Sequence, residues 1–150
     1  MKKKLFSVIY ILLLCLIVFV VSIFFVEQEQ LIGIVLVLLS VLCIIALMPF
    51  RISLKAMRPD IFFGIIDNGI LAVMAIIGGL FAGVVGAIIG GVVGNAITDG
   101  IAGIFEGYAA EDMRSKNIQE ERAILKSAVG KMAGCLLGAG VVLIIYGFIV

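Results

Sequence analysis

Apolar residues dominate the chain in long runs that are interrupted by short polar segments. The first two runs, residues 5–26 and 31–50, are separated by the polar tetrapeptide 27–30. A run of about 20 apolar residues is long enough to cross the hydrocarbon core of a bilayer as a helix. Because the polar link is short, we predict that the second helix returns antiparallel to the first.

The next apolar stretch, residues 61–108, is too long for one crossing and is rich in glycine. We predict two antiparallel helices here, with the chain reversing near Gly83. The pattern as a whole predicts an all-α membrane helical bundle. It forms one domain, residues 1–150, with five transmembrane helices at 5–26, 31–50, 61–82, 85–108 and 127–150 and loops at 51–60 and 109–126.

Basic residues predict the orientation of this bundle. All eleven Lys and Arg residues lie within 2–4, 51–58 and 114–131. In the five-helix arrangement these segments share one side of the membrane, which the positive-inside rule assigns to the cytoplasm. Glu27 and Glu29 are the charges on the other side. The N-terminus is therefore predicted to be cytoplasmic and the C-terminus to lie on the opposite side.

Composition narrows the class of protein further. With 64% hydrophobic and 14% charged residues, the chain is not an ordinary soluble domain. The net charge of +1, without a basic cluster beyond residues 2–4, predicts no nucleic-acid partner. We find no nucleophile–base pair and no cofactor fingerprint, so we expect neither an enzyme nor a bound cofactor. Cys15, Cys43 and Cys135 lie in separate apolar runs and are interpreted as small membrane hydrophobes without a disulfide.

Glycine divides the chain into two halves, because most of the 18 glycines come after residue 63. Small residues at i and i+4 let helix backbones approach closely, which drives helix packing in lipid. We therefore predict that the last three helices form the core and include a homo-oligomer face, while the first two face lipid. The spaced glycines are Gly79/Gly83, Gly86/Gly90/Gly94, Gly103/Gly107 and Gly130/Gly134/Gly138.

Two acidic residues interrupt the glycine-rich stretch. Asp67 and Asp99 are separated by 31 residues without a charge, 68–98. An ionised group at membrane depth costs at least about 2.5–3.5 kcal/mol, so such an acid is by default a functional hypothesis. A reversal at Gly83, midway between the two acids, would place them at the same depth on facing helices.

Further polar residues extend both positions into stripes. Asp60 and Asp67 are at i and i+7, and Asn95, Asp99 and Glu106 are at i, i+4 and i+11, so each set shares one helix face. Oxygen ligands of this kind suit hard or borderline divalent cations such as Mg²⁺, Mn²⁺ or Fe²⁺. We predict a divalent-metal path lined by these five residues. Structural alternatives remain for Asp60, as an acid at a helix N-terminus, and for Glu106, as an interfacial acid.

These motifs carry a resemblance to a known family. The relevant runs are Asp60…Gly64…Asp67-Asn68-Gly69, Thr98-Asp99-Gly100 and Glu106-Gly107-Tyr108. Over about residues 59–112 the chain resembles the vacuolar iron transporter family, although Asn68 and Gly103 stand where that family has glycine and methionine. The resemblance implies a five-helix homodimer that carries divalent iron and manganese, exchanging metal for protons along a path at the dimer interface.

The sequence thus favours a membrane transporter or binding protein for a divalent cation of the Fe²⁺/Mn²⁺ kind, coupled to protons and acting as a homodimer. A different class is a non-catalytic glycine-rich subunit that docks into a larger membrane complex. A third is a proton-conducting hairpin like a rotary ATPase ring subunit. This third class is less favoured because Asp67 and Asp99 lie toward the cytoplasmic end of their helices.

Overall fold

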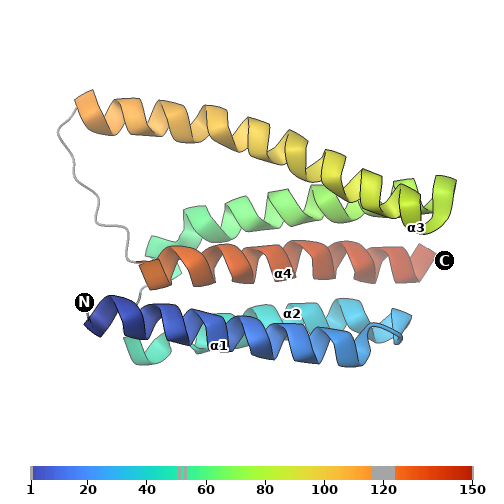
Figure 1. Ribbon diagram of the computed structural model, residues 1–150, viewed down its shortest axis with the longest axis horizontal. Helices are drawn as coiled ribbons and strands as arrows, with labels where there is room; N and C mark the ends of the chain where they lie inside the picture. Colours follow the sequence, from blue (N-terminus) through green and yellow to red (C-terminus); the bar gives the residue numbers. More distant parts are fainter. Residues whose placement is uncertain (1, 51, 53, 116–123, 150) are drawn as a thin grey trace. The chain divides into compact units, whose positions relative to one another are not determined.

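The computed structural model describes residues 2–50, 52, 54–115 and 124–149, and within these ranges it leaves out the side chains of 2–4, 29–30, 56 and 105–115. The described part of the chain is almost entirely helical and contains no strand (Figure 1). Its elements are α1 (Lys2–Phe25), α2 (Glu29–Ile45), the short 3₁₀ helix η1 (Met48–Phe50), α3 (Leu54–Ser115) and α4 (Ile124–Ile149).

The number of helices differs from the prediction. The described residues form four α-helices instead of five, because the third and fourth predicted helices join into the 62 residues of α3. Helical geometry breaks inside α3 at Ala82 (φ −141°, ψ 24°) and Gly83 (φ 59°, ψ −140°). The reversal is confined to these two residues, so no loop separates the two halves. The positive φ at Gly83 is a backbone conformation that glycine adopts without a Cβ penalty.

From residue 70 onward, the segments of α3 before and after Gly83 fold back on each other (Figure 1). Within the unit Ile70–Arg122, Gly78 touches Gly86, and a Cβ added at Gly94 would lie 3.1 Å from the Cα of Leu71. Residues before Gly83 contact residues at a similar distance after it, which is the pairing of an antiparallel hairpin. A straight helix of this apolar length would extend about 70 Å, more than twice the thickness of a bilayer core. The reversal therefore lies where the sequence predicts it.

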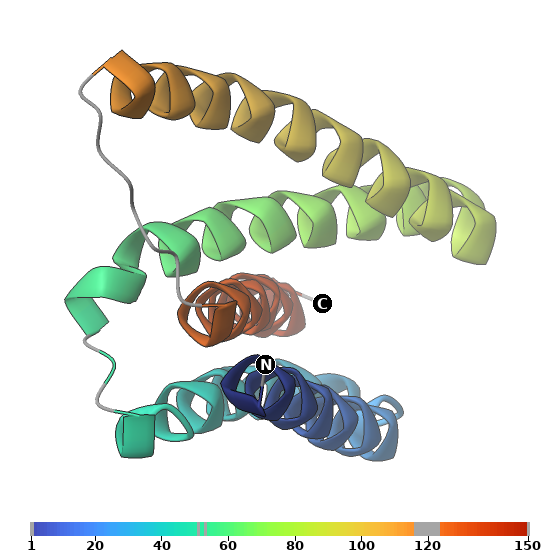
Figure 2. The same ribbon diagram turned by 60° about the vertical axis from the view of Figure 1, so that its left-hand side comes forward.

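The other compact unit contains Met1–Gly69 and Ala123–Val150. Here α2 runs antiparallel to α4: a Cβ added at Gly33 would lie 2.8 Å from the nitrogen of Ile144, and Ser40 donates a 2.7 Å hydrogen bond to the carbonyl of Ala133. The prediction that the second helix merely faces lipid is wrong, because Gly33 and Ser40 give α2 a close-packing face. Figure 2 shows α1 and α2 beside α4.

The first helix, α1, is anchored near its N-terminal end. Tyr10 donates a 2.6 Å hydrogen bond to the carbonyl of Ala46, and its ring stands edge-on to Phe50 with centroids 5.1 Å apart. Most other α1 side chains are exposed, including Phe24 at 82%. Exposed apolar side chains are expected where a helix meets lipid tails, as predicted for the first span.

Glycines also bring α4 against the first part of α3. We call this contact the α3–α4 seam: residues 57–69 of α3 and 125–138 of α4. Its glycines are buried, and Cβ atoms added to them would fall within about 3 Å of α3: Gly130 by Asp60, Gly134 by Ile61 and Gly138 by Ile65. Because both sets of numbers rise together, the two helices are parallel.

The predicted loop 51–60 is partly wrong, since α3 already begins at Leu54 and contains Pro59. Proline this close to a helix start removes a single hydrogen bond, to the carbonyl four residues earlier, so the helix continues. The predicted loop 109–126 is also shorter, because α3 continues to Ser115 and α4 begins at Ile124. Residues 116–123 lie outside the described part of the chain.

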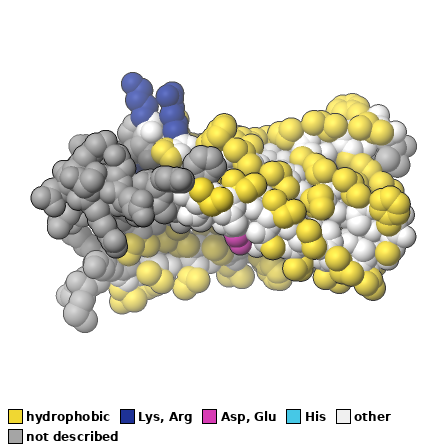
Figure 3. All heavy atoms as spheres, turned by 90° about the horizontal axis from the view of Figure 1, so that it is seen from above, with side chains coloured by type: hydrophobic (Ala, Val, Ile, Leu, Met, Phe, Trp, Pro, Cys, Tyr) yellow, Lys and Arg dark blue, Asp and Glu magenta, His cyan; other side chains and the backbone are white. Residues whose placement is uncertain are grey.

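All four α-helices contain segments long and apolar enough to cross a membrane. Hydrophobic side chains are spread over the coloured part of the face shown in Figure 3, and many large ones are exposed. This distribution indicates a membrane-embedded helical protein.

Candidate functional site

Asp60 lies in the α3–α4 seam and is only 7% exposed. Its Oδ1 atom accepts a 2.9 Å hydrogen bond from the hydroxyl of Ser127 on α4. Asp60 is the seventh residue of α3, so the structural alternative that places it at a helix N-terminus is wrong. The carboxyl is instead held by the facing helix, and the missing side chain at Gly130 leaves the space that Asp60 occupies.

Asp67 lies two helical turns further along α3 and is half-buried. Across the seam, the Cys135 thiol is hydrogen-bonded to the side chain of Asn68 and lies within electrostatic range of Asp67 and of Lys131. The predicted intramembrane acid is therefore part of a polar cluster built by two helices. We call Asp67, Asn68, Lys131 and Cys135 the seam cluster.

Lys131 contributes a cation to this cluster. Its Nζ atom stands 4.7 Å from the centre of the Phe63 ring, a cation–π distance. Lys131 belongs both to the predicted basic segment 114–131 and to the predicted helix 127–150, and it lies in α4 with its ammonium over Phe63 of α3. The spacing of residues in the sequence could have predicted that Lys131 faces α3. Lys131 follows Ser127 by one turn and precedes Gly134 by three residues, so it shares their helix face.

Asn95 and Asp99 form the second polar site, in the hairpin unit. The Nδ2 atom of Asn95 donates a 2.9 Å hydrogen bond to Oδ2 of Asp99. Asp99 is exposed, whereas its neighbour Thr98 is buried and donates its hydroxyl to the carbonyls of Gly94 (3.2 Å) and Asn95 (3.0 Å). The spacing i, i+4 correctly predicts that Asn95 and Asp99 share a face.

The five predicted metal residues are thus divided between the two compact units. Asp60 and Asp67 belong to the unit that includes α4, and Asn95 and Asp99 to the hairpin unit, so a site shared by Asp67 and Asp99 stays a prediction. The side chain of Glu106 lies outside the described residues. Within the described part, no group of three or more His, Cys, Asp or Glu residues converges on one point.

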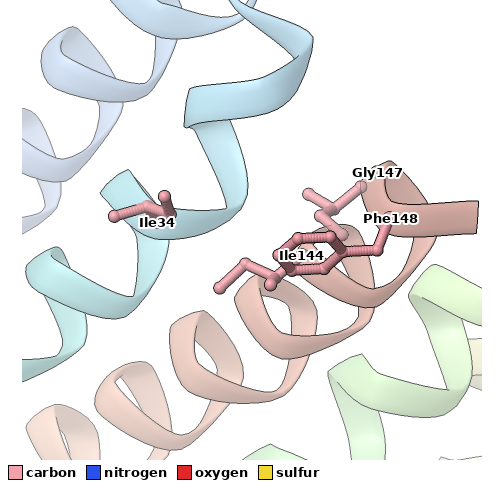
Figure 4. A pocket seen from close by; sticks show the side chains of 5 residues that line it. Ile34, Ile144, Gly147 and Phe148 are labelled. Carbon is pink, nitrogen blue, oxygen red and sulfur yellow. The ribbon is translucent and has the colours of Figure 1, made fainter.

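An apolar groove of about 330 Å³ lies elsewhere, between α2 and the end of α4. Figure 4 shows Ile34 on one side and Ile144 and Phe148 on the other, with Gly147 beside them. Hydrocarbon side chains provide no ligand for an ion, so this groove does not compete with the polar sites as a cation site.

The chain was compared with protein-family models, with curated proteins and with solved structures, and none of them matches it.

Proposed function

We propose that this protein is a homodimeric membrane carrier for a divalent cation of the Mn²⁺/Fe²⁺ kind, coupled to protons, in which Asp67 and Asp99 are the principal ligands. The observation that carries the proposal is the Asn95–Asp99 pair, a carboxylate and a carboxamide joined at 2.9 Å within a long apolar helix. Such a pair is costly at membrane depth and has no packing role on an exposed face.

The chemistry of the pair favours a hard or borderline cation. One amide N–H of Asn95 donates to Oδ2 of Asp99, which leaves the carboxamide oxygen and the second carboxylate oxygen as ligands. These are oxygen donors, the kind that Mn²⁺ and Fe²⁺ accept and that soft cations avoid. Metal binding to a carboxylate displaces any proton on it, which supplies the coupling to protons.

The exposure of Asp99 supports the homodimer. A carboxylate on a membrane helix is stable when protein or water covers it, since lipid tails offer it no hydrogen bond. Beside it, no atom of the described residues lies within 4 Å of a Cβ added at Gly100 or Gly103, which leaves room for a second backbone on this face. A face that carries both a donor and an acceptor is self-complementary, as a two-fold interface requires.

The test is Mn²⁺ uptake by protein reconstituted in liposomes. Asp67→Asn and Asp99→Asn are each expected to reduce uptake at least about tenfold while the protein still elutes as a folded dimer. Glu27→Gln is the matched control, because it removes one negative charge from the turn between α1 and α2. Uptake that is unchanged in both Asp variants would refute the proposal.

The second candidate is a subunit of a larger membrane complex, and the open face at Gly100 and Gly103 favours it equally. The two candidates differ in oligomeric state and metal response. A dimer that dissociates when Gly103 is replaced by Leu supports the carrier. A monomer that shows no thermal shift with Mn²⁺ supports the subunit.

A further inference from the structure

Lys131 places a positive charge well inside α4. It is the eighth residue of that helix, about 10 Å along the axis from its start. The ammonium lies over the Phe63 ring of α3, at 4.7 Å from its centre, and the residue is half-buried. A cation in this position requires a compensating group nearby, because lysine at membrane depth is as costly as aspartate.

The helix register brings Asp67 to the same place. Phe63 and Asp67 are one turn apart on α3, so their side chains are neighbours on one face. Gly64 lies between them and lets α4 approach so closely that an added Cβ would be 2.5 Å from the carbonyl oxygen of Lys131 and 2.7 Å from the nitrogen of Cys135. The acidic and basic side chains therefore share one short length of the seam.

A third residue reports the same proximity. The thiol of Cys135, one turn beyond Lys131, lies within electrostatic range of both the Asp67 carboxylate and the Lys131 ammonium. The side chain of Asn68, on α3, is hydrogen-bonded to this thiol. The cluster thus contains one acid and one base, together with neutral polar groups that can orient them.

We propose that Lys131 is the built-in counter-cation of Asp67, and that a cation entering from outside reaches this carboxylate by displacing the ammonium. The second part rests on the proposed carrier function, whereas the first part does not. When the site is empty, the ammonium neutralises Asp67 and lowers the cost of holding the acid in the membrane. When a divalent cation arrives, the ammonium leaves the carboxylate and keeps its contact with the Phe63 ring. Lys131 is thus a positioning residue that sets how tightly the site holds its cargo.

The pairing is tested by a double-mutant cycle without metal. Asp67→Asn and Lys131→Met should each lower the midpoint of thermal unfolding in detergent, because each leaves one charge uncompensated in the seam. The double variant Asp67→Asn/Lys131→Met should recover most of the loss. A double variant whose loss is the sum of the single losses, or which is no more stable than the worse single variant, overturns the pairing.

Displacement is tested by Mn²⁺ binding to the dimer. Lys131→Met should bind Mn²⁺ at least about fivefold more tightly, since the competing cation is gone. Lys131→Arg should retain weak, wild-type-like binding. Lys126→Met, on the same helix and one turn nearer its start, is the matched control and should leave the affinity unchanged. Equal or weaker binding by Lys131→Met overturns the displacement. A wild-type protein that binds no Mn²⁺ refutes the carrier and with it the displacement, and the cycle then still decides the pairing.

Discussion

Replacing Gly134 by alanine should destabilise the protein by separating α4 from α3. The added methyl group would fall within 3.0 Å of the Cα, carbonyl carbon and carbonyl oxygen of Ile61. These are backbone atoms, so no side-chain rotation can relieve the overlap, and the helices must move apart. A shift of 0.5–1 Å, on the order expected here, forfeits about a quarter to a half of each van der Waals contact along the seam.

The magnitude follows from two opposing effects. Overpacking of this kind lowers the free energy of unfolding by about 1–3 kcal/mol, and replacing a glycine inside a helix by alanine raises it by up to about 1 kcal/mol. We expect a net loss of about 1–2 kcal/mol, because a backbone obstacle places Gly134 toward the costly end of the range. For a domain of this size, that corresponds to a fall of roughly 2–8 °C in the unfolding midpoint.

Cys43 provides the assay, since its side chain is 0% exposed and becomes reactive when the bundle opens. A thiol-reactive dye would follow its exposure on heating, in a Cys15→Ser/Cys135→Ser background because Cys15 is exposed and Cys135 is half-buried in the folded protein. Gly147→Ala is the matched control on the same helix, with no atom within 4 Å of the added methyl group. If Gly134→Ala unfolds at the same temperature as Gly147→Ala, the reasoning about the seam is refuted.

Three further predictions concern single features. Ser127→Ala should cost about 1–3 kcal/mol in thermal unfolding, since it leaves the buried carboxyl of Asp60 without its hydroxyl donor, and an unchanged midpoint would contradict this role. Gly83→Ala should lower the free energy of unfolding by about 1–2 kcal/mol because φ is positive at this residue. Gly79→Ala in the same hairpin should be nearly neutral, and equal unfolding midpoints for the two variants would contradict the role of Gly83 in the turn. Accessibility tags should place the N-terminus and the 109–126 segment on the cytoplasmic side and the C-terminus opposite, and termini found on one side would exclude five crossings.

Much of this architecture could be predicted from local patterns. The lengths of the apolar runs predict membrane helices because bilayer thickness sets a minimum span. The position of the reversal could also be predicted, since a 48-residue apolar helix cannot cross once and Gly83 is a residue that accepts positive φ. The shared face of Asn95 and Asp99 follows from helical periodicity alone.

Other features depend on which helices meet, and periodicity carries no information about partners. Gly130, Gly134 and Gly138 have the four-residue spacing that is typical of contacts between membrane helices of different subunits. Here they pack against α3 of the same chain, because close approach of two backbones needs small residues in either case. The hydroxyl of Ser127 donates a hydrogen bond to the carboxyl of Asp60, and no local pattern links these two residues, which lie 67 positions apart.

By itself, the sequence of this protein determined that the chain forms apolar helices, where the glycine-rich stretch reverses and which residue types break the apolar pattern. These properties follow from composition and periodicity, which act over a few residues. The packing of α2 along α4 and the position of Lys131 over Phe63 of α3 depend instead on tertiary contacts. Such choices depend on the fit of two helix surfaces far apart in the chain, where a single missing Cβ, as at Gly64, determines whether the backbones can meet.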